Sequence, residues 1–277
     1  MKTIRMQVAY DGRAYHGWQI QPEDRTVEGV LTRAVTRILN ADEPVKVQGA
    51  SRTDSGVHAR GQVAHFYHDT DRTPWELTRG LNGLTDDDIC VVRLEEADQE
   101  FHARHSARGK IYRYRIWNHR FPHPFLRGRA WHIRRDLDVE AMQRASELLV
   151  GRHDFAGFRS TNCASPTTVR TMDRVEVRPQ GDRFVEIIVQ GEAFLQYMVR
   201  IMSGTLVDIG MGRLEASAIE KAFRTKDRRD AGMTAPAHGL ELVEVFYPDF
   251  DWRGDKPTLG GPILADNQYY EARKRSG

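Results

Sequence analysis

Cysteine is scarce in this sequence, which contains only Cys90 and Cys163 among its 277 residues. Two isolated cysteines cannot supply the spaced ligand sets of zinc or iron–sulfur sites. We therefore expect two reduced structural thiols and no bound metal, as in proteins of a reducing compartment. A chain of this length can bury a sizeable core without disulfides.

The sequence also has no long hydrophobic run, and its first residues are not those expected of a signal peptide. Residues Met1 to Tyr10 alternate between polar and apolar types and contain no apolar block. The most apolar stretch runs from Phe194 to Ile209. It is interrupted by Gln196, Arg200 and Asp208, and it is too short to span a bilayer. We expect it to form a buried helix in a cytoplasmic protein that has no contact with membranes.

The motifs of common cofactor chemistries are missing as well. The sequence has no phosphate-binding Gly-x-x-x-x-Gly-Lys-Ser/Thr motif and no Gly-x-Ser-x-Gly nucleophile elbow. Gly210-Met211-Gly212 begins like a dinucleotide-binding loop, but it follows a predicted helix and not a strand. These absences exclude the common nucleotide, hydrolase and redox chemistries, and we expect an activity that needs no cofactor.

Charge is nearly balanced overall, at +2, but it is unevenly distributed. The segment from Phe101 to Arg135 carries ten Arg or Lys residues, several aromatic residues and no Asp or Glu. The preceding segment, Asp86 to Glu100, has seven acids and one Arg. Segregation of this kind attracts phosphates to one surface, whereas an ordinary solvated face mixes both signs. The basic segment therefore favours nucleic-acid binding.

Periodicity predicts two similar halves. Alternation predicts strands over Thr3–Tyr10, Val45–Gln48, Gln62–His68, Lys110–Trp117, Met172–Val177, Phe184–Val189 and Leu240–Tyr247. Helical spacing predicts helices over Val27–Asn40, Val139–Val150 and Phe194–Ile209. We expect an α+β protein in which two strand–helix–strand halves, residues 1–103 and 104–249, form a mainly antiparallel, helix-backed sheet with a central cleft. Residues 250–277 are predicted to be an extension.

One loop stands out between two predicted strands. In Gly49-Ala50-Ser51-Arg52-Thr53-Asp54-Ser55-Gly56-Val57-His58-Ala59, small and turn-forming residues bracket an arginine and an aspartate. Such a loop can present a carboxylate on a rigid edge with donors beside it. By itself, the loop favours Asp54 as a turn residue that accepts backbone hydrogen bonds.

Several motifs, in order along the chain, resemble the bacterial tRNA pseudouridine synthase A family. They are Ala9-Tyr10-Asp11-Gly12, Tyr15-His16-Gly17-Trp18-Gln19-x-Gln21, Thr26-Val27-Glu28-Gly29, Arg52-Thr53-Asp54-Ser55-Gly56-Val57-His58-Ala59-x-Gly61-Gln62-Val63, Lys110-x-Tyr112-x-Tyr114, His153-Asp154-Phe155-x-x-Phe158, Met198-Val199-Arg200 and Gly239-Leu240-x-Leu242. The resemblance covers residues 3–249. Thr85-Asp86 departs from the family pattern, and the chain after Asp249 lies outside it.

The resemblance implies isomerisation of uridine to pseudouridine at positions 38, 39 and 40 in the anticodon arm of tRNA, by a homodimer with the pseudouridine synthase fold. It implies no cofactor and no metal. Asp54 would act as nucleophile or base, and the residues leave that choice open. Arg200 would pair with this carboxylate, since a lone buried arginine is costly. Tyr112 would stack on the uracil and take the C5 proton.

The resemblance also implies substrate-binding residues around this centre. Arg52 is expected to fill the gap left by an extruded base or to hold a phosphate. Further contacts are expected from His58, Leu240, Arg104, Arg108 and Lys110. Two alternatives stay open: a pseudouridine synthase for a different RNA, and an RNA-binding module without catalysis. The Gly-Trp-Gln and His-Asp-Phe segments favour the tRNA enzyme.

Overall fold

The computed structural model describes residues 1–181, 183–248, 250 and 252, so most of the predicted 250–277 extension lies outside the described residues. The first half forms β1 (Thr3–Tyr10), α1 (Val27–Ile38), β2 (Gln48–Gly49), β3 (His58–Tyr67), α2 (Pro74–Leu84) and β4 (Ile89–Ala97). The second half forms β5 (Gly109–Asn118), β6 (Trp131–Ile133), α3 (Val139–Glu147), β7 (Gly151–Asp154), β8 (Val169–Gln180), β9 (Phe184–Gly191), α4 (Met198–Gly210), α5 (Ser217–Thr225) and β10 (Leu240–Phe246).

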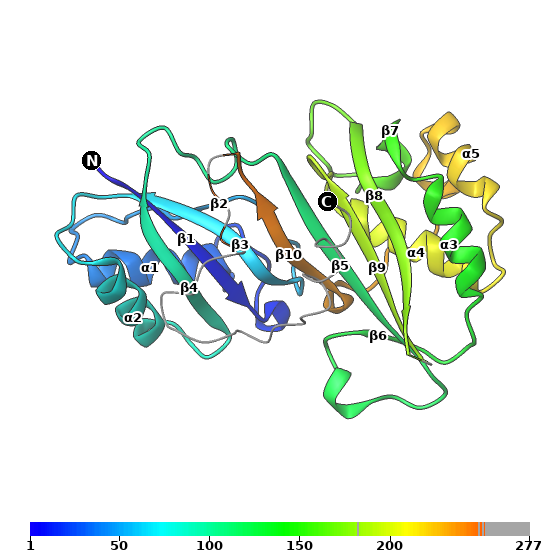
Figure 1. The fold of residues 1–277 in the computed structure, drawn as a ribbon, viewed down its shortest axis with the longest axis horizontal. Helices are drawn as coiled ribbons and strands as arrows, with labels where there is room; N and C mark the ends of the chain where they lie inside the picture. Colours follow the sequence, from blue (N-terminus) through cyan, green and yellow to red (C-terminus); the bar gives the residue numbers. More distant parts are fainter. Residues whose placement is uncertain (182, 249, 251, 253–277) are drawn as a thin grey trace.

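The strands form one sheet that runs through both halves, as Figure 1 shows, in the order β4-β1-β3-β10-β5-β9-β8-β7. β2 pairs with β3 and β6 pairs with β5. The described pairs are antiparallel except for β10–β3 and β5–β6. β10 returns to the centre of the sheet and joins β3 of the first half to β5 of the second. The predicted α+β architecture, with a mainly antiparallel, helix-backed sheet, is confirmed.

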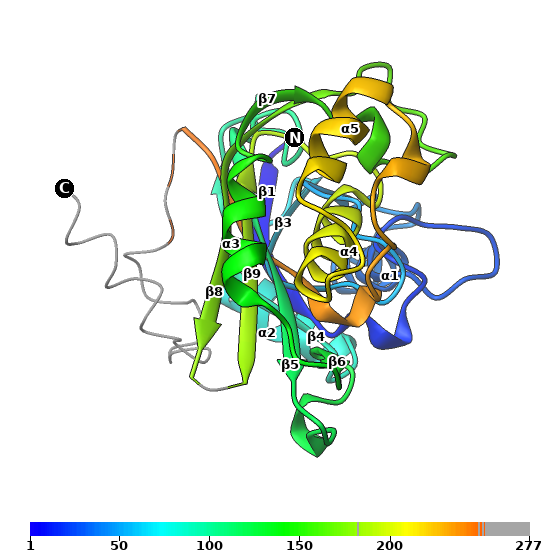
Figure 2. The ribbon, with the colours of Figure 1, turned by 90° about the vertical axis from the view of Figure 1, so that its right-hand side faces the viewer.

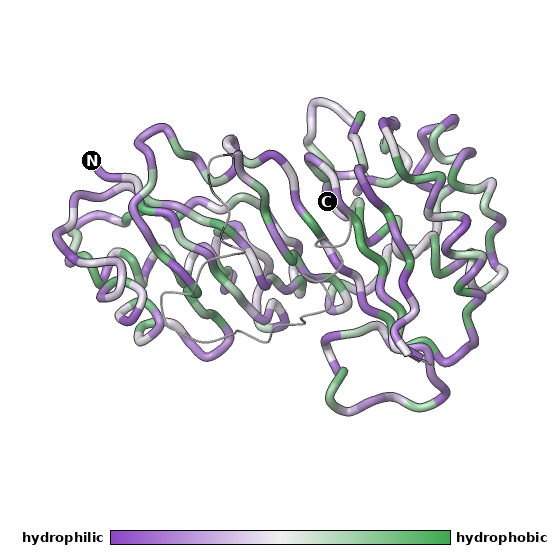
Figure 3. The backbone as a smooth tube through the Cα atoms, viewed as in Figure 1, coloured by the Kyte–Doolittle hydropathy of each residue, from purple (hydrophilic) through white to green (hydrophobic). Residues whose placement is uncertain are grey.

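Helices cover one side of this sheet. In the edge-on view of Figure 2, α1 and α4 lie on the same side of the strands. α1 buries Val27, Val30, Leu31, Ala34 and Val35, the apolar stripe that its spacing predicts. Its first turn is capped by the Thr26 side chain, which accepts from the Gly29 N–H. Figure 3 shows hydrophobic and hydrophilic residues interleaved along the strands, as expected where one sheet face packs against helices.

The helix predicted over Phe194–Ile209 begins later than expected. α4 starts at Met198, because Tyr197 adopts a left-handed backbone conformation with φ 64° that a continuous α-helix cannot contain. Arg200 therefore lies in the first turn of α4 and not in the middle of a long buried helix. This position brings its side chain to the junction of the two halves.

Two helices and three strands of the described residues were not predicted from the sequence: α2, α5, β4, β6 and β7. α2 carries a readable start signal, because the Thr73 and Glu76 side chains form a capping box around Pro74. β4 lies inside the acidic segment, where charged residues hide a strand whose Ile89, Val91 and Leu94 are buried. Among the described residues, no helix combines the length and the apolar character needed to cross a bilayer.

Candidate active site

Backbone hydrogen bonds fix the Asp54 loop against the first half of the chain. The Trp18 N–H donates to the Thr53 carbonyl at 3.0 Å, and the Val57 N–H donates to the Asp54 carbonyl at 3.1 Å. Gly17 has φ +90°, and a Cβ atom at this position would lie 2.7 Å from the Thr53 oxygen. Only glycine fits such a close approach without strain. The Gly-Trp segment and the loop thus form one rigid support for the carboxylate.

Asp54 pairs with Arg200 across the junction of the two halves. The Arg200 Nη1 lies 3.3 Å from the Asp54 Oδ2, and each side chain is 15% exposed. The Arg200 Nε donates to the Ala235 carbonyl at 2.9 Å, and its guanidinium lies 4.7 Å from the centre of the Tyr197 ring. Burial raises the pKa of Asp54, although the Arg200 charge and hydrogen bond oppose the increase. The structure thus brings the two residues of the predicted pair together.

Tyr112 reaches the same centre from β5. Its hydroxyl lies 2.6 Å from the Ser51 Oγ, in the segment that leads to Asp54. The Phe194 ring packs edge-on against it with 5.0 Å between ring centres. Burial raises the pKa of Tyr112 well above its ordinary value, and the nearby Asp54 charge adds to the increase. The phenol is therefore neutral at physiological pH, which suits a stacking surface better than a proton acceptor.

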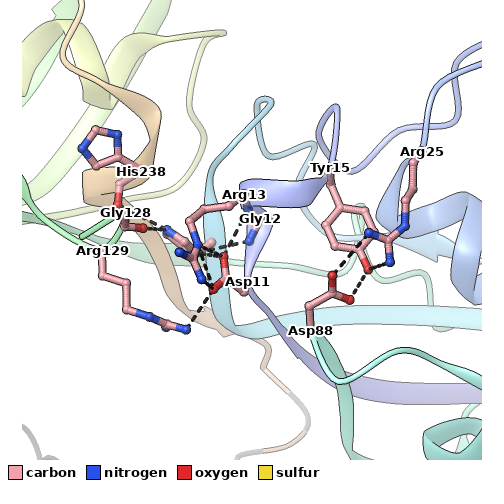
Figure 4. Close-up of polar contacts among 10 residues, drawn as sticks. Asp11, Gly12, Arg13, Tyr15, Arg25, Asp88, Gly128, Arg129 and His238 are labelled. Atoms are coloured by element: carbon pink, nitrogen blue, oxygen red, sulfur yellow. Dashed lines mark hydrogen bonds and ion pairs between the residues drawn. The ribbon is translucent and has the colours of Figure 1, made fainter. Parts of the chain in front are cut away.

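His58 is buried beneath this loop, and both of its ring nitrogens have partners. Nδ1 accepts from the Gly12 N–H at 3.2 Å, and Nε2 lies 2.9 Å from the Gly128 carbonyl and 3.2 Å from the His238 carbonyl. Burial lowers the pKa of His58 despite the neighbouring Asp11. Figure 4 shows Gly12, Gly128 and His238, which come from three separate segments of the chain, close to one another. These contacts hold three backbone segments together beneath the loop, and the substrate contact of His58 stays a prediction.

This geometry can be set beside known proteins. A family model described as tRNA pseudouridine synthase matches residues 6–106 and 145–248. The chain belongs to the tRNA pseudouridine synthase family. Its assignment as an isomerase that makes pseudouridine, first suggested by the motifs, is thereby confirmed.

Curated relatives agree over nearly their whole length. The tRNA pseudouridine synthase A of Acetivibrio thermocellus is 42% identical over 247 residues, which are 89% of this chain and 100% of the relative. The protein of the same name from Ruminiclostridium cellulolyticum is 44% identical with the same coverage. The one from Pseudoalteromonas atlantica is 42% identical over 264 residues, 95% of this chain and 99% of the relative. A solved Cbf5-Nop10-Gar1 complex is similar at 12% identity, with 88% of this chain and 60% of that chain covered, but its TM-score of 0.34 is too low to support an argument.

The remaining predicted binding residues of this pseudouridine synthase differ in their exposure. Leu240 is buried at the start of β10, in the centre of the sheet. Arg52, Arg104 and Arg108 are exposed. Lys110 is partly buried at the start of β5, where burial, with a smaller contribution from the Arg104 charge, lowers its pKa to about 8. The three exposed arginines and Lys110 can therefore reach a polyanion, whereas Leu240 can form only an apolar wall.

A second group of charges lies on the other side of the sheet. Glu241 of β10 receives Arg113 Nη2 at 2.7 Å, Arg115 Nη2 at 2.8 Å and Arg60 Nε at 3.5 Å. Arg113 Nη1 also lies 3.2 Å from the Glu186 Oε1. Although burial opposes it, the surrounding arginines lower the pKa of Glu241 to about 2. Successive residues of a strand point to opposite faces, so this group faces away from Tyr112.

These ion pairs limit which residues of the basic segment, Phe101 to Arg135, can bind phosphates. Arg113 and Arg115 are neutralised inside the protein by glutamates that lie far away in sequence. The acidic segment is likewise paired with cations of the first half: Arg25 with Asp86, Arg5 with Glu95 and Lys2 with Glu96. Only the exposed cations of the basic segment can contribute to an RNA-binding surface.

Proposed function

We propose that this enzyme converts uridine to pseudouridine at positions 38, 39 and 40 in the anticodon arm of tRNA, with Asp54 as its catalytic carboxylate. The single observation that carries the proposal is the buried Asp54–Arg200 pair. A buried carboxylate with a raised pKa and one cationic partner is typical of a reacting group. The names of the curated relatives support tRNA as the substrate.

The reaction is an isomerisation, so this site needs to supply no oxidant and no group donor. The N1–C1′ bond of uridine breaks and a C5–C1′ bond forms. The proton on C5 leaves, and N1 gains a proton. Ionised Asp54 assists as a nucleophile or as a base. Arg200 favours the ionised form against the effect of burial, and Tyr112 stacks on the uracil.

The direct test is incubation of the enzyme with unmodified tRNA, followed by mapping of pseudouridine at each nucleotide. Modification at positions 38, 39 and 40, without added nucleotide, is the expected result. Activity should survive EDTA when a short anticodon stem-loop is the substrate, because a stem-loop separates catalysis from tRNA folding. Modification only elsewhere, or only in another RNA, would contradict the assignment.

The proposal extends to assembly and location. Residues 1–103 and 104–249 would act as two halves around the central site, in a homodimer that works where tRNA is found, in the cytoplasm. Resemblance to the family supports the dimer, and the two free cysteines suit a reducing compartment. Sedimentation equilibrium tests the dimer directly, and a monomer at micromolar concentration would exclude it.

A further inference from the structure

The segment between β5 and β6, residues 119–130, projects from the sheet as a loop with a short 3₁₀ turn at Pro124–Leu126, visible next to β6 in Figure 1. It carries two large apolar side chains that are mostly in solvent. Phe121 is 62% exposed and Phe125 is 87% exposed. Isolated exposed apolar residues are common, but two aromatic rings on one projecting loop form a surface suited to binding.

These two rings are the outer members of an ordered series. From the end of β5, Trp117 lies 5.3 Å from His119, which lies 6.0 Å from Phe121. A second branch runs from Trp117 to His123 at 5.4 Å and from His123 to Phe125 at 5.9 Å. Trp117 Nε1 donates to the Phe121 carbonyl, and the Phe121 N–H donates to His119 Nδ1. The loop thus has a defined shape that holds the rings in place.

The charge of the loop points to one class of partner. Residues 101–135 contain no Asp or Glu. Exposed arginines flank the two phenylalanines on both sides: Arg120, Arg127, Arg134 and Arg135. Flat rings among arginines match single-stranded nucleic acid, which offers unstacked bases and phosphates together.

The base of the loop is tied to the catalytic segment. The Gly128 carbonyl contacts Nε2 of His58, which lies four residues after Asp54. Arg129 Nη2 forms an ion pair of 2.9 Å with Asp11, as Figure 4 shows. Gly128 has φ +71°, and a Cβ there would lie 2.5 Å from the Arg13 side chain. The loop is therefore held in a fixed relation to the catalytic carboxylate.

We propose that the 119–130 loop is a second RNA-binding element, in which Phe121 and Phe125 stack on unpaired bases of the tRNA held at Asp54. This inference rests on the proposed function, because it names how the same substrate is held. Stacking is tolerant of base identity, so the loop adds affinity without selecting a sequence. That property suits an enzyme that accepts uridines at several neighbouring positions.

The experiment compares the Phe121→Ala/Phe125→Ala double variant with wild type in tRNA binding and in turnover. Loss of stacking should weaken binding and raise KM at least about tenfold, with kcat at saturating tRNA within about twofold of wild type. The slope of log K against log salt should not change, because the alanine double variant keeps every cation that can bind phosphate. Phe121→Trp/Phe125→Trp should restore binding. Trp75→Ala is the matched control, since Trp75 is 51% exposed beside Arg79 on α2, away from the loop.

Wild-type affinity in the alanine double variant would overturn the inference while leaving the proposed function intact. An equal loss in the Trp75→Ala control would also overturn it, because the effect would then be general. If the double variant changes oligomeric state and keeps its tRNA affinity, the rings cover a protein surface and the RNA role is wrong. Failure of the proposed function shows separately, in the pseudouridine map of the wild-type enzyme.

Discussion

Two carboxylates, Asp54 and Glu241, are buried near the middle of this molecule. They differ in the number of arginines that lie beside them. Asp54 meets the single guanidinium of Arg200, and burial raises its pKa. Glu241 meets three guanidinium groups, which lower its pKa to about 2. A buried carboxylate with little positive charge beside it is hard to ionise, and such a perturbed group is typical of a reacting site. A buried carboxylate with several cations beside it stays ionised and stabilises the fold. This is the contrast that we expect between the proposed catalytic carboxylate, Asp54, and a structural one, Glu241.

Removal of the structural carboxylate should have the largest effect on stability. Glu241→Gln leaves Arg60, Arg113 and Arg115 close together, with one glutamate fewer to neutralise them. We expect a loss of about 3 kcal/mol in the free energy of unfolding at pH 7, measured by urea denaturation. Glu140→Gln is the matched control, because that exposed pair with Arg144 should contribute less than about 0.5 kcal/mol.

The Glu241→Gln variant should also change how the free energy of unfolding depends on pH. The folded-state pKa of Glu241 is lowered from 4.5 to about 2, so its contribution is fully present above pH 4.5 and is lost as pH falls towards 2. The stability difference between wild type and Glu241→Gln should therefore shrink across this window. A difference that stays constant from pH 5 to pH 2 would show that the carboxylate charge is not what stabilises the junction.

The Arg200→Met variant tests how the guanidinium beside Asp54 affects the ionisation of that carboxylate. Without the guanidinium, burial alone acts on Asp54 and its pKa should rise further. We expect turnover at pH 7 to fall about 100-fold, and the acid limb of the pH–rate profile to move to higher pH. Single-turnover rates from pH 5 to pH 9 provide the measurement. An unshifted profile with reduced turnover would mean that Arg200 acts on the RNA and not on the carboxylate.

Smaller effects should separate backbone contacts from base contacts in the basic segment. An Arg104→Ala/Arg108→Ala variant should reduce the slope of log K against log salt by somewhat under about one unit for each phosphate that it no longer binds. Tyr112→Phe should leave this slope unchanged and lower turnover, because it keeps every cation but removes the hydroxyl that contacts Ser51 in the segment that leads to Asp54. An unchanged slope in the double arginine variant would mean that these arginines form a solvated face, and Arg224 to Arg229 would become the next candidate for the RNA path.

The sequence predicted one of the two carboxylate sites and missed the other. The motif around Asp54 and the resemblance to a family led to the pairing with Arg200, which the structure shows. The Glu241 group was not foreseen, because its ion pairs join strands more than 120 residues apart in sequence. No local pattern reveals such a pairing. The late start of α4 was missed for a related reason, since a positive φ at Tyr197 leaves no signature in residue type.

The most direct test of the account is the Asp54→Asn variant, measured for both turnover and stability. The amide has the same shape but cannot act as nucleophile or base, so pseudouridine formation should fall below about 1% of wild type. Burial opposes the ionised form of Asp54, so the fall in melting temperature should be smaller than that of Glu241→Gln even though Arg200 loses its ion-pair partner, and most tRNA affinity should remain. Residual turnover above about 1% would contradict the catalytic assignment. A large fall in melting temperature would contradict the contrast between the two carboxylates.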